Sequence, residues 1–301
     1  MTPAPTFYEA SVAIFGPGLL GGSLALALRE RCPSANIRVW ARREEAAEKV
    51  RLLGVADFVS CNVSAVAQEA SLIILATPVE TMPSLARQIA ASELSPEVLV
   101  TDVGSVKSNV VDALEPIFEG RASFVGSHPM AGSEKAGIDE ARADLFHGAA
   151  CIVTPRAATP VTIVERLRAF WDCLGCRVLV RDPATHDCEV ARISHLPHMM
   201  AAVTTRAGLA GHAGAIDCIG NGFRDSTRVA AGDPGLWAGI VAGNRAEILA
   251  ALKDAQAQLG QLVEIIANLD DEALRDFLAQ AKALRDAVPA ATVSPPWPQS
   301  K

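Results

Sequence analysis

The chain has 301 residues, of which 50% are hydrophobic and 20% charged, and its formal net charge is −7. This composition indicates a soluble globular protein of one large or two ordinary domains. The negative charge argues against nucleic acid and anionic membranes as partners, because both favour basic patches. No apolar run reaches the roughly 20 residues that cross a bilayer, and residues 1–10 do not read as a signal peptide. We therefore expect a cytoplasmic protein.

Seven cysteines, scattered among apolar neighbours, suit a reducing compartment better than a disulfide framework. Cys173 and Cys176 form a C-x-x-C pair with no second pair and no nearby histidine. A buried pair of thiols is favoured there over a metal or redox site.

Over residues 1–182, short β-branched runs alternate with amphipathic stretches, which predicts a mostly parallel sheet covered by helices. Between the first two apolar runs, Leu20, Leu24 and Leu28 repeat every four residues, as on one face of a helix. The fold class is therefore α/β for this part of the chain. The strands are expected at residues 11–16, 36–41, 71–78, 97–104, 123–128 and 150–155.

The pattern changes at residue 183, where Ala- and Leu-rich helical periodicity replaces the strand-like runs up to residue 288. Asn244 and Glu247 have the spacing of a capping box at the start of a long helix. Its apolar stripe would be poorly buried in one chain, so we expect an all-helical domain that pairs with a second subunit. Residues 289–301 are expected to form a flexible tail. The stripe consists of Ile248, Leu252, Leu259, Leu262 and Ile266.

The segment "GPGLLG" follows an apolar run and opens the first predicted helix. Its first glycine suits a tight turn, its second lets a pyrophosphate approach, and its third lets helix and strand pack closely. Free N–H groups at the start of the helix then bind the phosphates. We predict a Rossmann-type dinucleotide-binding domain rather than a merely structural turn. The residues expected to contact the cofactor here are Gly16, Gly18, Leu19, Leu20, Gly21, Thr77 and Pro78.

The second predicted strand ends at Ala41, where an acid often holds the ribose 2′-hydroxyl of NAD. Arg42 and Arg43 follow, and guanidinium groups are good donors to a 2′-phosphate. The sequence therefore favours NADP. The alternative is that both arginines only occupy the exposed start of a helix, which leaves NAD possible.

Ser105, Lys107 and His128 follow or end two later strand-like runs. Ligands of such sheets bind at the carboxyl ends of strands, so we expect these residues to face the crevice. A histidine in this position is more often structural. With the Ser105 hydroxyl on one ring nitrogen, however, His128 could turn its other nitrogen toward a substrate.

Five segments occur in a characteristic order and spacing: "GPGLLGGSL", "TDVGSVK", "GSHPMAGSEKAG", "SHLPHMMA" and "GFRDSTRVAAGDPGLW". With these segments the chain resembles the prephenate and arogenate dehydrogenases of tyrosine biosynthesis over residues 10–285. The resemblance implies a Rossmann-type domain for NAD or NADP and an all-helical C-terminal domain that forms a homodimer. It implies the oxidative decarboxylation of prephenate, with arogenate or dual-specificity cyclohexadienyl dehydrogenase as alternatives.

The resemblance also assigns roles to four residues. His128 would be the catalytic base, and Ser105 would orient it. Arg228 matches the arginine that binds the ring carboxylate of the substrate, and His198 matches a substrate-contacting histidine of the helical domain.

Three further features surround these residues. Glu134 and Lys135 follow His128 closely enough to face the same pocket, although a solvated ion pair is nearly as good an interpretation. Pro197 is expected to interrupt a helix at the pocket wall. His195 and His198 have no third ligand at suitable spacing, so we expect no metal site.

Two other classes of protein share parts of this pattern. A β-hydroxyacid dehydrogenase or ketopantoate reductase would need a lysine acid/base in its helical domain, but Lys253, Lys282 and Lys301 lie in no pocket-like motif. A non-catalytic dinucleotide sensor would keep the glycine loop without needing the catalytic histidine and its partners.

Overall fold

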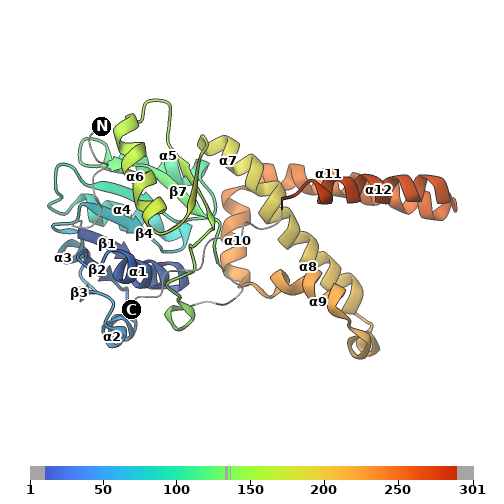
Figure 1. Cartoon of the computed structure of the whole chain (residues 1–301), viewed down its shortest axis with the longest axis horizontal. Helices are drawn as coiled ribbons and strands as arrows, with labels where there is room; N and C mark the ends of the chain where they lie inside the picture. The colour runs from blue at the N-terminus through green and yellow to red at the C-terminus, as the bar shows by residue number, and fades with distance from the viewer. Residues whose placement is uncertain (1–10, 133–134, 136, 290–301) are drawn as a thin grey trace.

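A computed structural model of the chain describes residues 11–132, 135 and 137–289. It consists of an α/β part from which long helices project (Figure 1). The α/β part holds a six-stranded parallel sheet in the order β3-β2-β1-β4-β5-β6. No helix among the described residues is long and apolar enough to cross a membrane. The six strands are β1 (Ser11–Phe15), β2 (Asn36–Trp40), β3 (Phe58–Ser60), β4 (Leu72–Leu75), β5 (Leu99–Asp102) and β6 (Ser123–Phe124).

Helices cover both faces of this sheet. The strand order reverses at β1, which pairs with β2 on one side and β4 on the other. In open α/β sheets, ligands bind beyond the carboxyl ends of the strands at such a reversal. The helices are α1 (Leu19–Arg31), α2 (Glu44–Leu53), α3 (Val63–Ala67), α4 (Met82–Ala90), α5 (Ser108–Phe118) and α6 (Val161–Cys173), with short 3-10 turns η2 (Val79–Thr81) and η3 (Ile138–Glu140).

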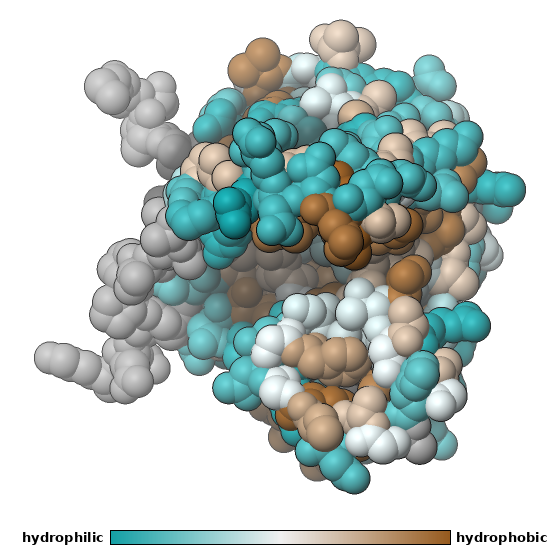
Figure 2. Space-filling view, turned by 90° about the vertical axis from the view of Figure 1, so that its right-hand side faces the viewer, coloured by the Kyte–Doolittle hydropathy of each residue, from teal (hydrophilic) through white to brown (hydrophobic). Residues whose placement is uncertain are grey.

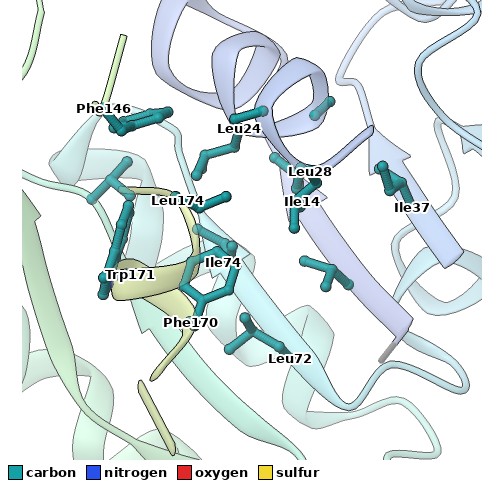
Figure 3. Packing of buried hydrophobic residues seen from close by; sticks show 14 of the residues in the cluster. Ile14, Leu24, Leu28, Ile37, Leu72, Ile74, Phe146, Phe170, Trp171 and Leu174 are labelled. Atoms are coloured by element: carbon teal, nitrogen blue, oxygen red, sulfur yellow. The ribbon is translucent and has the colours of Figure 1, made fainter. Parts of the chain in front are cut away.

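The core confirms the periodicity predicted for the first helix. Leu24 and Leu28 of α1 are fully buried, and Leu20 packs against the same cluster. Figure 3 shows the side chains of α1 and the sheet meeting Phe170 and Trp171 of α6. These contacts fix α1 against β1, and so they fix the loop between them.

The strand expected over residues 123–128 is in fact two strands in different sheets. β6 ends at Phe124, and β7 (Gly126–Pro129) pairs antiparallel with β8 (Ala150–Thr154). β9 (Arg177–Val180) completes this second sheet, and neither it nor the three-residue β3 was expected from the sequence. A Cβ at Gly126 would lie 2.6 Å from the Thr154 hydroxyl oxygen, so glycine permits the close approach of β7 and β8.

The second part of the chain is helical, as predicted. α11 and α12 project together from the α/β part, and α8 and α9 form a second arm (Figure 1). The tail predicted over residues 289–301 lies outside the described residues except for Pro289. The helices are α7 (Pro183–Val190), α8 (Leu196–Leu209), α9 (Asn221–Thr227), α10 (Pro234–Gly243), α11 (Arg245–Ala267) and α12 (Asp271–Asp286), with 3-10 turns η5 (Ala213–Cys218) and η6 (Arg228–Ala231).

The expected interruption near Pro197 is a π-helical turn, η4 (Ala191–His195), between α7 and α8. Proline has no N–H to donate to the carbonyl one turn earlier, so a regular α-helix cannot continue through this point. The wider turn carries His195 into the interior, where it is fully buried.

The capping box predicted at Asn244 was wrong. Asn244 directly precedes α11, but its side chain makes no capping hydrogen bond. Its Nδ2 instead donates to the main-chain oxygen of Asp187 at 2.8 Å. The same oxygen also accepts the N–H of Ala191, so the amide adds a second donor and connects the start of α11 to α7.

The apolar stripe of α11 is only partly covered. Ile248 is buried, and Leu252 and Leu262 are partly buried, whereas Leu259, Ile266 and the neighbouring Val263 are each more than half exposed. Figure 2 shows hydrophobic residues along the hollow between the helical arms. An exposed apolar surface of this kind marks an interaction site. The hollow between α8, α11 and α12 is lined by Leu196, Met200, Leu259, Leu262 and Phe277 among others.

Candidate functional site

In the glycine loop between β1 and α1, Gly16 and Gly21 are tightly packed, whereas Gly18 faces open space. A Cβ at Gly21 would lie 2.0 Å from the Gly16 carbonyl oxygen, and one at Gly16 would lie 2.8 Å from the Ala76 oxygen. At Gly18 nothing lies within 4 Å of such an atom. α1 begins at Leu19 with no side-chain cap, so the N–H groups of its first turn are available to an anion.

Thr77 lies directly beside this loop. Its methyl carbon is 2.9 Å from the Cβ position of Gly16, and its hydroxyl oxygen is buried without a hydrogen-bond partner among the described residues. Gly16 donates its N–H to the Trp40 carbonyl, so the end of β2 borders the same loop. The free helix start and the unpartnered hydroxyl fit the phosphates and polar groups of a dinucleotide.

Arg42 and Arg43 follow β2 and are exposed. Neither guanidinium forms an ion pair with another described residue. Alanine at position 41 places no acidic side chain directly before them, whereas Glu44, which pairs with Arg51, and Glu45 follow at the start of α2. This corner of the site therefore offers two guanidinium groups without an ion-pair partner among the described residues.

His128 lies on β7 and is 6% exposed. Its Nδ1 is 2.9 Å from Nε2 of His186, a residue of α7. The other nitrogen of His186 is 2.8 Å from Oδ1 of Asp187. The Asp187 carboxylate also accepts main-chain N–H groups of Lys107 at 2.8 Å and Ser108 at 2.9 Å. Two rings and a carboxylate thus form one hydrogen-bonded chain.

Burial sets the protonation of these three side chains. It lowers the pKa of His128 well below its ordinary value, and the neighbouring His186, Lys107 and His195 act in the same direction. Burial also lowers the pKa of His186, although Asp187 opposes this effect. For Asp187, burial alone would raise the pKa, but the hydrogen bonds it accepts hold it below its usual value. Near pH 7 the arrangement is two neutral imidazoles and one carboxylate.

Lys107 does not face the crevice as expected, because it is fully buried. Its ammonium group is hydrogen-bonded to the buried Asp102 carboxylate and donates to the Ser127 carbonyl at 3.0 Å. Asp102 also accepts the N–H of Gly104 at 2.8 Å. The inward lysine joins the loop after β5 to the residue that precedes His128.

Ser105 lies on this same loop and is half-buried. The Nδ1 atom of His128 is bonded to His186, and the Ser105 hydroxyl has no hydrogen bond with the described residues. The main chain of Ser105 instead influences His195. Burial lowers the pKa of the His195 ring to about 4, although the charge of Asp187 and a hydrogen bond with the Ser105 main chain raise it. The orienting role of Ser105 stays a prediction.

His198 and Arg228 belong to a second group on the helical part. The His198 ring stacks on Trp237 with centroids 3.4 Å apart and planes 15° from parallel. A Cβ at Gly232 would lie 2.7 Å from the Trp237 indole nitrogen and 3.2 Å from a carbon of the His198 imidazole, so the Gly232 backbone packs closely against both rings. Arg228 is exposed and starts the short η6 turn that ends just before this glycine.

Of the two loop residues after His128, Glu134 lies outside the described residues. Lys135 is exposed, and its ammonium nitrogen lies 2.9 Å from the Glu140 carboxylate. The partner is Glu140 rather than Glu134, so both interpretations of Glu134 and Lys135 stay predictions.

Sequence reasoning missed His186, Asp187 and Asp102. The only signal for the first two is an adjacent His-Asp pair shortly before the "SHLPH" segment. Nothing in that pair indicates a partner 58 positions earlier in the chain.

The sequence was compared with known families and proteins. Residues 24–180 match the family "Prephenate dehydrogenase, nucleotide-binding domain", and residues 182–280 match "Prephenate dehydrogenase, dimerization domain". The prephenate dehydrogenase of Bacillus subtilis (strain 168) is 33% identical over 284 residues, which cover 93% of this chain and 76% of the relative. The cyclohexadienyl dehydrogenase of Zymomonas mobilis is 31% identical over 278 residues, covering 91% and 94% of the two chains.

A solved structure shares this architecture over most of the chain. It is the crystal structure of the prephenate dehydrogenase from A. aeolicus in complex with hydroxyphenyl propionate and NAD+. The two chains superpose with a TM-score of 0.86 at 30% sequence identity, and the match covers 93% of this chain and 98% of that chain.

The buried Lys107–Asp102 pair yields a stability prediction. Lys107→Met should destabilise the protein by about 3–5 kcal/mol, because it leaves a carboxylate buried without its counter-charge. Adding Asp102→Asn should recover part of this loss. The control is Lys49→Met, which breaks an exposed pair with Asp139 and should have a much smaller effect. Urea unfolding measures all four proteins, and equal effects of the two lysine substitutions would contradict the role of the buried pair.

Proposed function

Since the chain belongs to the prephenate/arogenate dehydrogenase family of NAD(P)-dependent oxidoreductases, we propose that it catalyses the oxidative decarboxylation of prephenate to 4-hydroxyphenylpyruvate. We propose NADP as its preferred cofactor. The observation that carries the proposal is the buried imidazole of His128, which is bonded through Nδ1 and has no hydrogen bond on Nε2 from the described residues. An arogenate or dual-specificity enzyme is the second candidate, favoured by the similarity to a cyclohexadienyl dehydrogenase.

The proposed reaction needs one base and accurate positioning. Hydride leaves C4 of the cyclohexadienol ring while its hydroxyl proton passes to Nε2 of His128. The C1–carboxylate bond then breaks, its electrons complete the aromatic ring, and carbon dioxide leaves. When bound, the nicotinamide ring accepts the hydride. Aromatisation makes the decarboxylation strongly favourable, so binding the substrate in the correct orientation matters more than further catalysis.

The second group of residues supplies contacts for the anionic substrate. We propose that Arg228 binds the ring carboxylate, which a guanidinium can hold through two hydrogen bonds. His198, flattened against Trp237, would contact the substrate with its remaining polar edge. Ser105, Glu134 and Lys135 remain proposed neighbours of the same pocket.

His128→Asn is the direct test of the base. Turnover should fall by about 10²-fold or more with little change in KM, because a general base is lost while binding groups remain. The matched control is His212→Asn, which replaces an exposed histidine. Absorbance of the reduced nicotinamide, followed with prephenate and with arogenate, gives both constants and the preferred substrate. Full turnover by His128→Asn would contradict its role, and no turnover by the unaltered protein on either substrate would contradict the proposed function.

The two arginines after β2 yield a test of the cofactor. The Arg42→Ala/Arg43→Ala double variant should raise KM for NADP by about tenfold or more, since charge-assisted hydrogen bonds to the 2′-phosphate are lost. KM for NAD should hardly change, and this serves as the internal control. Equal effects on both cofactors would contradict the NADP preference.

We further propose that two copies of the chain form a homodimer, in which the partner covers the exposed apolar side chains of α11. The match to a dimerization domain over residues 182–280 supports this, as does the exposure of more than half of each of Leu259, Val263 and Ile266.

Val263→Asp should convert the dimer to a monomer, because it places a charge inside the proposed interface. Val161→Asp, on the exposed start of α6, is the matched control and should leave the dimer intact. Sedimentation equilibrium distinguishes these outcomes, and a dimeric Val263→Asp protein would contradict the assignment.

A further inference from the structure

The hydrogen-bonded chain of His128, His186 and Asp187 combines two parts of the molecule. His128 lies on β7 of the α/β part, whereas His186 and Asp187 lie on α7, the first helix of the helical part. All three side chains are at least nine-tenths buried, so water competes little with their contacts. Every hydrogen bond in the chain must therefore be consistent with the protons that its members carry.

Those protons can be assigned from the acceptor end. The Asp187 carboxylate can only accept, so the 2.8 Å contact requires a proton on Nδ1 of His186. A neutral imidazole carries one proton, which leaves Nε2 of His186 as an acceptor. The 2.9 Å contact then requires the proton of His128 to reside on Nδ1. Nε2 of His128 is consequently the basic nitrogen.

The acceptor end is itself held firmly. The Asp187 carboxylate receives two N–H groups at the start of α5, where the helix dipole also favours a negative charge. Its main-chain oxygen is bonded to Asn244. Among the described residues, the other charged or titratable groups around the rings are Lys107, paired with Asp102, together with His195 and Cys151. Asp187 is the described carboxylate that is hydrogen-bonded to His186, so it sets the direction of the hydrogen bonds.

We propose that His186 and Asp187 are positioning residues that hold His128 in its Nδ1–H form and take up positive charge when Nε2 accepts the substrate proton. The inference rests on the proposed function only for the identity of that proton donor. As Nε2 of His128 gains a proton, the Nδ1 proton can shift along the hydrogen bond to Nε2 of His186. His128 is then neutral again with its proton on Nε2, and His186 is an imidazolium paired with the Asp187 carboxylate.

The arrangement also makes the base depend on domain packing. The Nδ1–H form is the minor tautomer of free histidine, so His128 would revert to a mixture of forms if α7 moved away. A histidine with its proton on Nε2 cannot accept another there. The helical part would thus contribute to catalysis in two ways, by holding His128 of the α/β part in its Nδ1–H form and by its own substrate contacts.

The first test is the protonation of the rings in the full-length, unaltered protein. Selective ¹⁵N-histidine labelling and two-bond nitrogen–proton correlation spectra near pH 7.5 distinguish the two tautomers. His128 and His186, assigned through single substitutions, should both carry their proton on Nδ1. A proton on Nε2 of His128 would overturn the proposal. This readout needs no substrate, so it stands apart from the success or failure of the proposed reaction.

The second test uses two substitutions of His186. His186→Leu removes the acceptor, and kcat should fall at least about tenfold with KM nearly unchanged, while His128 shifts toward its Nε2–H form. His186→Gln keeps an oxygen near the Nε2 position, and it should restore the Nδ1–H form and part of the turnover. Equal losses in both variants with His128 still in its Nδ1–H form would show a merely structural role and overturn the proposal. If neither variant folds, the spectra of the unaltered protein decide alone.

Discussion

The hydrogen bond between the rings of His128 and His186 is the contact on which the rest of the site depends. It joins a strand of the α/β part to the first helix of the helical part, and it lies where polar groups have almost no access to water. A buried contact of this kind permits only one arrangement of protons, because an unpaired donor or acceptor there would be costly. The carboxylate of Asp187 settles which arrangement that is.

The cationic side chains near the site differ in burial. Lys107 is turned into the interior against Asp102, so its charge supports the loop after β5 rather than a ligand. Arg42, Arg43 and Arg228, the arginines proposed to bind anions, are exposed. Burial favours neutral imidazoles, which can accept protons, whereas a guanidinium stays charged. The proposed base is therefore buried, and the proposed anion-binding groups are exposed.

The sequence predicted those features that depend on local chemistry. The glycine loop was recognisable because Gly16 and Gly21 have no room for a side chain, and the stripe of Leu24 and Leu28 follows from helical periodicity. Features that depend on distant contacts were missed. The inward turn of Lys107 depends on Asp102 being buried beside it, and the side chain of Asn244 bonds a carbonyl of α7 instead of capping its own helix. Likewise, the adjacent His-Asp pair at 186 and 187 acquires meaning only once β7 leaves the main sheet and reaches α7.

In the proposed reaction, Nε2 of His128 takes the hydroxyl proton of the substrate. The most direct measurement is a crystal structure of the protein with NADP and 4-hydroxyphenylpyruvate bound. We expect the product hydroxyl oxygen to lie about 2.6–3.2 Å from Nε2, while Nδ1 keeps its bond to His186. A hydroxyl bound by a different side chain, or a His128 ring turned away from the nicotinamide, would rule out His128 as the base.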